Sequence, residues 1–228
     1  MLTSLRVKDI AIFKHGNIGI MFKRLDKNLV EIELYRHNNR DVIGVIGLAE
    51  NDEITLVPYP LGRESNIKCL MFKLKQPITV LPNSKIAIST YLPFSIAIFS
   101  NNALIKIVNV FKIKLALYGT PTMGDLCIYV RESDLINYSE LLANLKIILT
   151  NNTHEALAVE KLIMPVEGLG IFSNEYGDVV YNVVKAFLIS TPRGTVIEIS
   201  TTTEPSRENN FKGIIKPETV TYIMRHGY

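Results

Sequence analysis

Alternation of apolar and polar residues with a period of two is the feature of this sequence that most restricts its fold. The segment 29–35 alternates throughout, with Val30, Ile32 and Leu34 on one parity and Glu31, Glu33 and Tyr35 on the other. Successive side chains of a strand point to opposite faces, so this pattern predicts a half-buried strand. We expect it to form a hairpin with the strand 18–23, and we expect its glutamates to lie on a solvated face.

The longest segment with the same alternation spans 104–118, which we expect to be one strand. Its apolar parity holds Ile105, Ile107, Phe111, Ile113 and Leu115, and its polar parity holds Lys106, Lys112 and Lys114. We expect the first set in the core and the lysines in solvent, although a lysine face can also attract phosphates. Asn109 falls on the core parity, so it needs a hydrogen-bond partner or marks a bulge.

Short strands separated by turn residues recur along the chain of 228 residues, and β-branched residues are frequent. This pattern favours an all-β, mainly antiparallel, β-sandwich-like fold over alternating strands and helices. We expect two packed halves, 1–118 and 119–228, divided at the glycine-rich loop 119–125; one large β domain is the alternative. One short helix is expected near 134–143, because Ser133 or Asp134 can cap it.

Four further segments carry local signals. Residues 156–164 fit a helix or a strand, and we favour a strand. Gln76-Pro77 is expected to interrupt the strand 68–75, because proline cannot donate to a ladder. Thr191-Pro192-Arg193-Gly194 predicts a hairpin turn, and two glycines within 42–48 indicate a bulged or edge strand.

The charge of the chain argues against a dedicated nucleic-acid binder. The net charge is +3 and the basic residues are scattered, whereas such proteins usually carry a clustered basic stripe. We expect no signal peptide, because Arg6, Lys8 and Asp9 interrupt the first apolar run. No window approaches the roughly eighteen apolar residues of a membrane-spanning helix. The expected location is therefore the cytoplasm.

No common catalytic or cofactor motif is present in the sequence. We find no phosphate-binding loop, dinucleotide fingerprint, zinc-protease helix or nucleophile elbow, and we expect no cofactor. The histidines are His15, His37, His154 and His226, all in polar surroundings where surface positions are expected. Cys69 and Cys127 lack metal-ligand spacing; two separate buried thiols are expected, and a disulfide is the alternative for a hyperthermophile protein.

One locality stands out as a candidate binding site. Its residues are Tyr118, Gly119, Gly124, Tyr129 and Arg131, which bracket the glycine-rich loop. An arginine beside tyrosines can stack on a ring and bind an anion, but it can also hold a structural corner together. We name these residues as candidate binding residues and assign no catalytic or metal-binding residue.

Several short motifs resemble an uncharacterised archaeal protein family of unknown function. They are Leu117-Tyr118-Gly119-Thr120-Pro121, Leu126-Cys127-Ile128-Tyr129-Val130-Arg131, Leu162-Ile163-Met164-Pro165, Gly170-Ile171-Phe172 and Asp178-Val179-Val180-Tyr181. The family pattern has an aromatic residue after the arginine, where this chain has Glu132. The resemblance implies an archaeal source and a β-rich fold, and it brings no activity.

Three functions of different classes fit the sequence. The preferred one is a non-catalytic module that binds another protein or a second copy of itself, for which we expect no deep polar cleft and an apolar or sheet-edge surface. The second is a hydrolase with an unfamiliar site for a small or carbohydrate-like substrate, which requires a pocket of perturbed carboxylates or histidines. The third is a weak nucleic-acid binder with a continuous basic groove.

Overall fold

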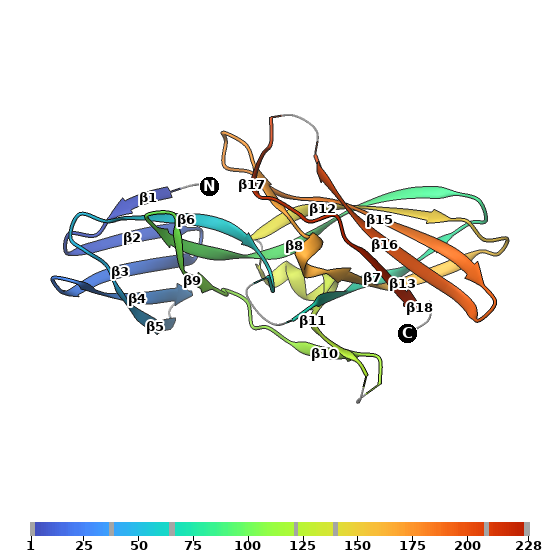
Figure 1. Ribbon diagram of the computed structural model, residues 1–228, viewed down its shortest axis with the longest axis horizontal. Helices are drawn as coiled ribbons and strands as arrows, with labels where there is room; N and C mark the ends of the chain where they lie inside the picture. The colour runs from blue at the N-terminus through green and yellow to red at the C-terminus, as the bar shows by residue number, and fades with distance from the viewer. Residues whose placement is uncertain are drawn as a thin grey trace. The chain divides into compact units, whose positions relative to one another are not determined.

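The protein is built from β-strands, as the computed structural model in Figure 1 shows. The structure describes residues 3–36, 39–63, 67–120, 123–138, 141–207 and 210–225. Strands β1 to β18 account for most of these residues, and the helical segments are two short 3₁₀ turns. The predicted all-β class is therefore confirmed, with parallel pairs among the mainly antiparallel ones.

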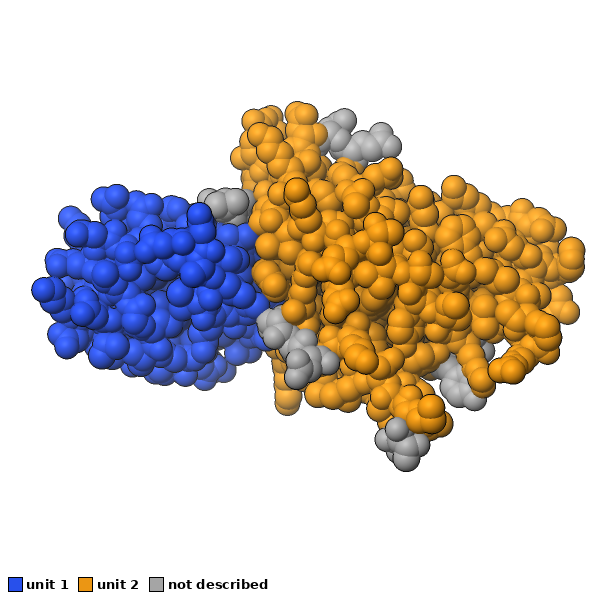
Figure 2. Space-filling model, in the orientation of Figure 1, with its two compact units in different colours: residues 1–58, 95–110 blue, residues 59–94, 111–228 orange. Residues whose placement is uncertain are grey.

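The chain divides into two compact units (Figure 2). Unit 1 contains residues 1–58 and 95–110, and unit 2 contains residues 59–94 and 111–228. The chain therefore leaves unit 1, enters unit 2, returns and leaves again. This division differs from the predicted halves 1–118 and 119–228. Those halves concern independent folding, which contacts alone do not test, so they stay a prediction.

Unit 1 contains a four-stranded antiparallel sheet with the order β2-β3-β4-β5. Its strands are β2 Ile10–His15, β3 Ile18–Asp26, β4 Leu29–Arg36 and β5 Asn39–Gly47. The unit also contains β1 Thr3–Arg6, β9 Ala103–Val108, most of β6 Glu53–Pro60 and the end of β8 Lys85–Ser100. The predicted β3–β4 hairpin is confirmed, and β5 has the predicted bulge.

Unit 2 contains a second four-stranded sheet with the order β10-β11-β7-β13. Its strands are β7 Cys69–Val80, β10 Leu115–Tyr118, β11 Asp125–Arg131 and β13 Leu157–Pro165. The remaining elements are β12 Leu142–Asn151, β14 Ile171–Ser173, β15 Val179–Thr191, β16 Gly194–Pro205, β17 Lys212–Ile215, β18 Thr221–Arg225, η1 Glu132–Tyr138 and η2 Val166–Gly168. The predicted strand at 156–164 and the turn at 191–194 are confirmed as β13 and the β15–β16 hairpin.

The segment 104–118 is not the single strand that its alternation predicts. It forms β9 and β10 with irregular backbone between them, because the two ends pair with different strands, β8 and β11. The predicted core parity is confirmed only in part: Phe111 is buried, but Val108 and Val110 of the other parity are also buried, and Ile105 and Leu115 are exposed. Asn109 has the partner that its position requires, because Ser95 donates a hydrogen bond to its side chain.

Two further local predictions are wrong. The expected helix near 134–143 is the 3₁₀ segment η1, and Leu142 and Ala143 already belong to β12. Strand-forming residues from 142 onward pair with β8, and this tertiary pairing overrides the helical spacing. The strand at 68–75 is not interrupted at Gln76-Pro77, and β7 continues to Val80. Its pairing with β13 continues on both sides of a register shift between Val159 and Lys161.

The glutamates of β4 differ from the solvated face that alternation predicts. Glu31 is half-buried, and Glu33 is fully buried although it lies on the face opposite the core. Its carboxylate is covered because Arg40 forms an ion pair with it and Tyr35 donates a hydrogen bond to it over 2.7 Å.

Within the part of the chain that the structure describes, no helix is long and apolar enough to cross a membrane.

Candidate functional site

The β10–β11 hairpin carries the predicted site residues. Tyr118 pairs with Asp125 at its closed end, and two glycines permit the turn. Gly119 has φ +113°, a left-handed conformation that side chains disfavour. A Cβ on Gly119 would lie 2.8 Å from the Cα of Gly124, and one on Gly124 would lie 2.7 Å from the Thr120 oxygen. Both glycines are therefore required by the turn itself.

Tyr118 lies against β18 rather than in a pocket. Its hydroxyl oxygen accepts a hydrogen bond from the Arg225 backbone N–H at 2.9 Å, and its ring lies 6.2 Å from the ring of Tyr222. The Tyr222 hydroxyl donates to Asp125 over 3.1 Å. Burial, followed by this hydrogen bond, raises the pKa of Tyr222, so it stays protonated. The contacts attach the hairpin to β18.

Tyr129 and Arg131 form a second pair toward the base of the hairpin. The Arg131 Nε donates to the Tyr129 hydroxyl oxygen over 3.1 Å, and the guanidinium lies 5.3 Å from the ring centre. This hydrogen bond is the main reason why the pKa of Arg131 is raised, so its charge is kept. The predicted residues therefore fall into two groups, one at the turn and one at the base.

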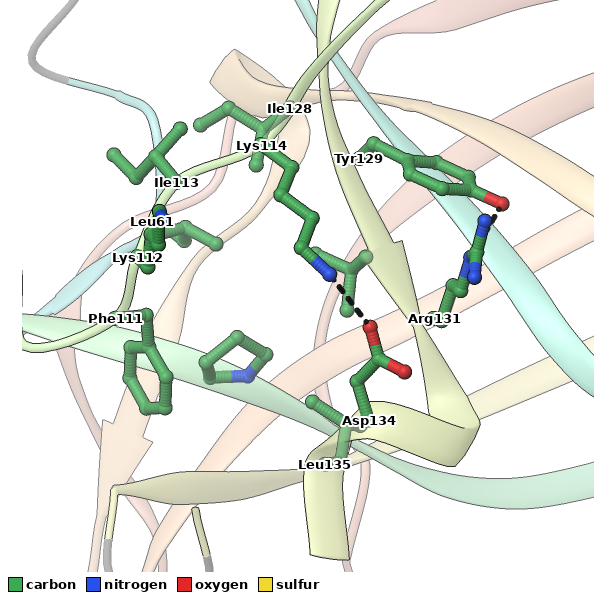
Figure 3. Close-up of a pocket in the computed structure, with 12 residues that line it drawn as sticks. Leu61, Phe111, Lys112, Ile113, Lys114, Ile128, Tyr129, Arg131, Asp134 and Leu135 are labelled. Atoms are coloured by element: carbon green, nitrogen blue, oxygen red, sulfur yellow. Dashed lines mark hydrogen bonds and ion pairs between the residues drawn. The ribbon is translucent and has the colours of Figure 1, made fainter. Parts of the chain in front are cut away.

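A small pocket of about 50 Å³ lies at the base of the hairpin (Figure 3). Its walls are largely apolar, with Leu61, Pro93, Phe111 and Leu135 among them. Lys114 reaches Asp134 over 3.1 Å and, with the Tyr129–Arg131 pair, flanks β11 on its two sides. The Lys114 hydrogen bond lowers the pKa of Asp134. Sites for organic ligands commonly measure about 300–1,000 Å³, so this pocket suits a few waters or a small ion.

The sequence analysis missed the exposed leucines of the hairpin. Leu115, Leu117 and Leu126 are 52%, 45% and 46% exposed, and Met123 near the tip is 89% exposed. Leu117 is paired with Leu126, so these two side chains lie on the same face. Leu115 falls on the predicted core parity, and no separate signal in the sequence indicates Leu117 and Leu126.

Strand β10 is the terminal strand of its sheet and pairs with β11 along one side. The Tyr129 N–H donates to the Lys114 oxygen over 2.7 Å, which makes these residues a hydrogen-bonded pair of the ladder. In an antiparallel ladder such pairs alternate with non-bonded ones, so the peptide groups of Leu115 and Leu117 point away from β11. They face the free side of β10, along which no other strand of the described residues pairs; we call this side the open edge of β10.

A disulfide joins the hairpin strand β11 to β7. Cys69 and Cys127 are neighbours on the parallel strands β7 and β11, and a disulfide joins them with a Cα–Cα distance of 4.6 Å. The expectation of two separate thiols is wrong, and the alternative is the one found. Both residues are fully buried, and the bond links β11 to β7, its neighbour in the sheet.

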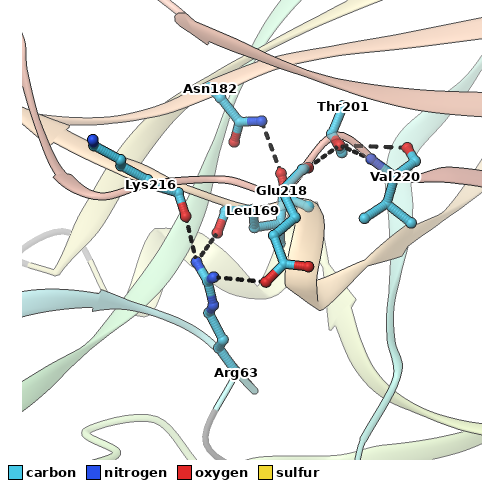
Figure 4. Close-up of polar contacts among 8 residues, drawn as sticks. Arg63, Leu169, Asn182, Thr201, Lys216, Glu218 and Val220 are labelled. Carbon is cyan, nitrogen blue, oxygen red and sulfur yellow. Dashed lines mark hydrogen bonds and ion pairs between the residues drawn. The ribbon is translucent and has the colours of Figure 1, made fainter. Parts of the chain in front are cut away.

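A separate polar cluster in unit 2 is structural (Figure 4). The buried Asn182 amide donates to the Gly168 and Thr202 oxygens, and its own oxygen accepts from the Gly170 N–H. Arg63 donates to the Lys216 oxygen over 2.8 Å and pairs with Glu218. These bonds fix the segment before β18.

Histidines and carboxylates do not gather into a metal centre among the residues that the structure describes. His15 and His154 belong to those residues, whereas His37 and His226 lie outside them. His154 is exposed in the turn that precedes β13. The hydrolase alternative therefore gains no support from a metal-binding cluster within the described ranges.

Comparison with known proteins identifies the family. The model of the family "Protein of unknown function (DUF432)" matches residues 2–226, nearly the whole chain, so the chain belongs to this family. The expected membership of a family of unknown function is confirmed, while the archaeal source stays a prediction. No curated protein and no solved structure matches the chain.

Proposed function

We propose that this DUF432 protein is a non-catalytic binding module, and that the β10–β11 hairpin takes an extended segment of a partner protein as an added strand. The observation that carries the proposal is the open edge of β10, where the peptide groups of Leu115 and Leu117 point outward. An extended segment can pair with such an edge through its main chain and place alternate side chains on each face.

The charges around the hairpin indicate what kind of segment fits. Lys68, Lys112 and Lys114 are exposed near it, as are Arg131 and Arg225, whereas the carboxylates are those of Asp125, Glu132 and Asp134. Asp125 and Asp134 form ion pairs with lysines, and the Glu132 carboxylate accepts hydrogen bonds from the Lys75 N–H and the Thr90 hydroxyl. The excess of positive charge favours a segment that carries aspartate or glutamate. The exposed leucines favour apolar residues at the alternate positions.

The small pocket supports binding rather than catalysis. Its volume of about 50 Å³ leaves little room for an organic substrate, Lys114 and Asp134 pair with each other, and Arg131 donates to the Tyr129 hydroxyl. Among the residues that line the pocket, Asp134 is the single carboxylate, and its ion pair with Lys114 favours binding over hydrolysis.

The test uses a short peptide in which aspartate and valine alternate, with a lysine–valine peptide of the same length as the control. Binding is followed by amide hydrogen exchange on the full chain. The acidic peptide should protect the outward amides of Leu115 and Leu117, whereas those of Ala116 and Tyr118 are already bonded to β11. The lysine peptide should leave all of them unchanged.

Two matched variants separate the edge from the side chain. Leu117→Pro removes an outward N–H without breaking the β10–β11 ladder, and Leu117→Ala keeps that N–H and removes only the side chain. We expect Leu117→Pro to abolish peptide binding and Leu117→Ala to weaken it. Equal binding by the wild type and Leu117→Pro would rule out strand addition at β10. Equal binding of the two peptides would rule out an acidic partner.

A further inference from the structure

The outer face of the β2–β5 sheet in unit 1 combines exposed apolar side chains with a fixed arginine. The strand register sets out its residues in rows across the sheet. Each row runs from β2 to β5. The first row is Lys14, Gly19, Tyr35 and Arg40, and the second is Ile12, Met21, Glu33 and Val42. The third row is Ile10, Lys23, Glu31 and Val45. This face is distinct from the β10–β11 hairpin, which belongs to unit 2.

The apolar residues of this face are unusually accessible for a sheet with its own core on the other side. Ile10, Ile12, Val42 and Val45 are 57%, 49%, 59% and 51% exposed. The opposite face buries Phe22, Val30 and Ile32 completely. The sheet therefore already has a core, and burial of the outer residues would add free energy only when another surface covers them.

At the centre of the face lies the buried carboxylate of Glu33. It pairs with Arg40, and the Tyr35 hydroxyl donates to its second oxygen over 2.7 Å. The guanidinium of Arg40 lies 5.9 Å from the centre of the Tyr35 ring. The Arg40 hydrogen bond lowers the pKa of Glu33, and the same bond raises the pKa of Arg40. Both groups are therefore charged at neutral pH.

This arrangement fixes the direction of Arg40 before any partner arrives. An arginine has several N–H donors in one plane, and Glu33 occupies only part of them. The side chain of Arg40 remains 54% exposed, so a partner can reach it from the solvent. A fixed arginine loses less side-chain entropy when it binds a second carboxylate. Arginine and tyrosine surrounded by apolar residues are typical of the energetic centre of a protein interface.

We propose that the outer face of the β2–β5 sheet is a docking surface for a partner protein that presents a carboxylate among apolar side chains, and that Arg40 binds this carboxylate. The charges of the face select this partner. Lys14 and Lys23 are exposed on the same face as Arg40, whereas Glu33 is buried and already paired and Glu31 is half-buried. Two copies of the same face would bring like charges together, so a second copy fits less well than an acidic surface.

The chemistry of the site can be tested with small probes on the full chain. Isovalerate carries a carboxylate on a branched apolar group, and isovaleramide has the same shape without the charge. The NMR signals to follow are the Arg40 Nε–H and the methyl groups of Ile12, Val42 and Val45. Isovalerate should shift the arginine and methyl signals with one saturation curve. Isovaleramide should leave the Arg40 signal unchanged.

Variants assign the response to the face. Arg40→Gln should lose the isovalerate response, and Ile12→Ser with Val42→Ser should weaken it severalfold while the Glu33–Arg40 pair stays intact. Lys114→Gln, in unit 2, should leave the response unchanged, as should Leu117→Pro. The result is therefore independent of strand addition at β10. Equal shifts from the acid and the amide, or shifts that persist in Arg40→Gln, would overturn the site.

The identity of the occupant needs a separate measurement. A photo-reactive phenylalanine analogue in place of Val42 should cross-link a partner segment rich in aspartate or glutamate, and Arg40→Gln should suppress that cross-link. A cross-linked segment without carboxylates would contradict the proposal. Sedimentation velocity covers the remaining occupant: a dimer that Val42→Lys dissociates would show that a second copy covers this face, and the acidic partner would then be wrong.

Discussion

Removal of the Cys69–Cys127 disulfide should lower the free energy of unfolding of unit 2 by about 4 kcal/mol. The bond links residues 58 positions apart, and closing a loop of that length removes about 14 cal/mol/K of entropy from the unfolded chain, or about 4 kcal/mol at 25 °C. The bond restrains the unfolded chain, so its loss stabilises the unfolded state more than it changes the native packing.

The measurement is urea unfolding followed by circular dichroism, with and without a phosphine reductant. Because both cysteines are fully buried, the reductant should act on the unfolded chain, so samples are equilibrated from the denatured side. For a slope of about 2 kcal/mol/M, the midpoint should fall by about 2 M on reduction. The double variant Cys69→Ala with Cys127→Ala is the control, and the reductant should not move its midpoint.

Two results would refute this reasoning. Titration of the urea-unfolded, unreduced chain with a thiol reagent should find no free thiol, since the sequence holds only these two cysteines and both are in the bond. Two reactive thiols would show that the bond is absent. Equal midpoints with and without reductant, in a chain without free thiols, would show that the unfolded state is already compact enough to make the cross-link ineffective.

Three further predictions concern substitutions of single residues. Arg40 lowers the pKa of Glu33, so the ionised carboxylate stabilises unit 1 at pH values above its ordinary pKa of 4.5. This contribution is lost as the pH falls through the lowered pKa. In acid titrations, the unfolding of Glu33→Gln should therefore depend less on pH below about pH 5. Asn182→Ala breaks the hydrogen bonds of a fully buried amide and leaves backbone groups unpaired. It should lower the free energy of unfolding, measured in urea, by about 3 kcal/mol. The control Asn174→Ala, at an exposed turn, should lower it by under about 1 kcal/mol. Gly124→Ala forces a Cβ to within 2.7 Å of a backbone oxygen, so it should speed hydrogen exchange in β10 and β11 while unit 1 exchanges as before.

Local pattern was enough to find most strands but not to find their partners. The alternation of 29–35 predicts β4 because the strand keeps the same neighbours, β3 and β5, along its length. The segment 104–118 has an equally clear pattern, yet β9 pairs with β8 and β10 pairs with β11. A period of two predicts that a strand has one apolar face. It does not predict which other element covers that face, or whether any element covers it.

The candidate site shows the same limit. The residues near the glycine-rich turn were named from the sequence, and the requirement for Gly119 and Gly124 follows from the turn that they form. The open edge of β10 could not be predicted, because the position of a strand at the edge of a sheet depends on which other strands pair with it.

The sequence by itself determined the all-β class, most of the turns and the family, because these depend on local alternation, turn residues and short motifs. The tertiary structure alone decided three features of the chain. It joined Cys69 to Cys127 by placing β7 beside β11, it buried Glu33 under Arg40, and it left Leu115 and Leu117 exposed. Each depends on contacts between segments distant in sequence or across strands, and the burial of a side chain is set by what covers it rather than by its neighbours along the chain.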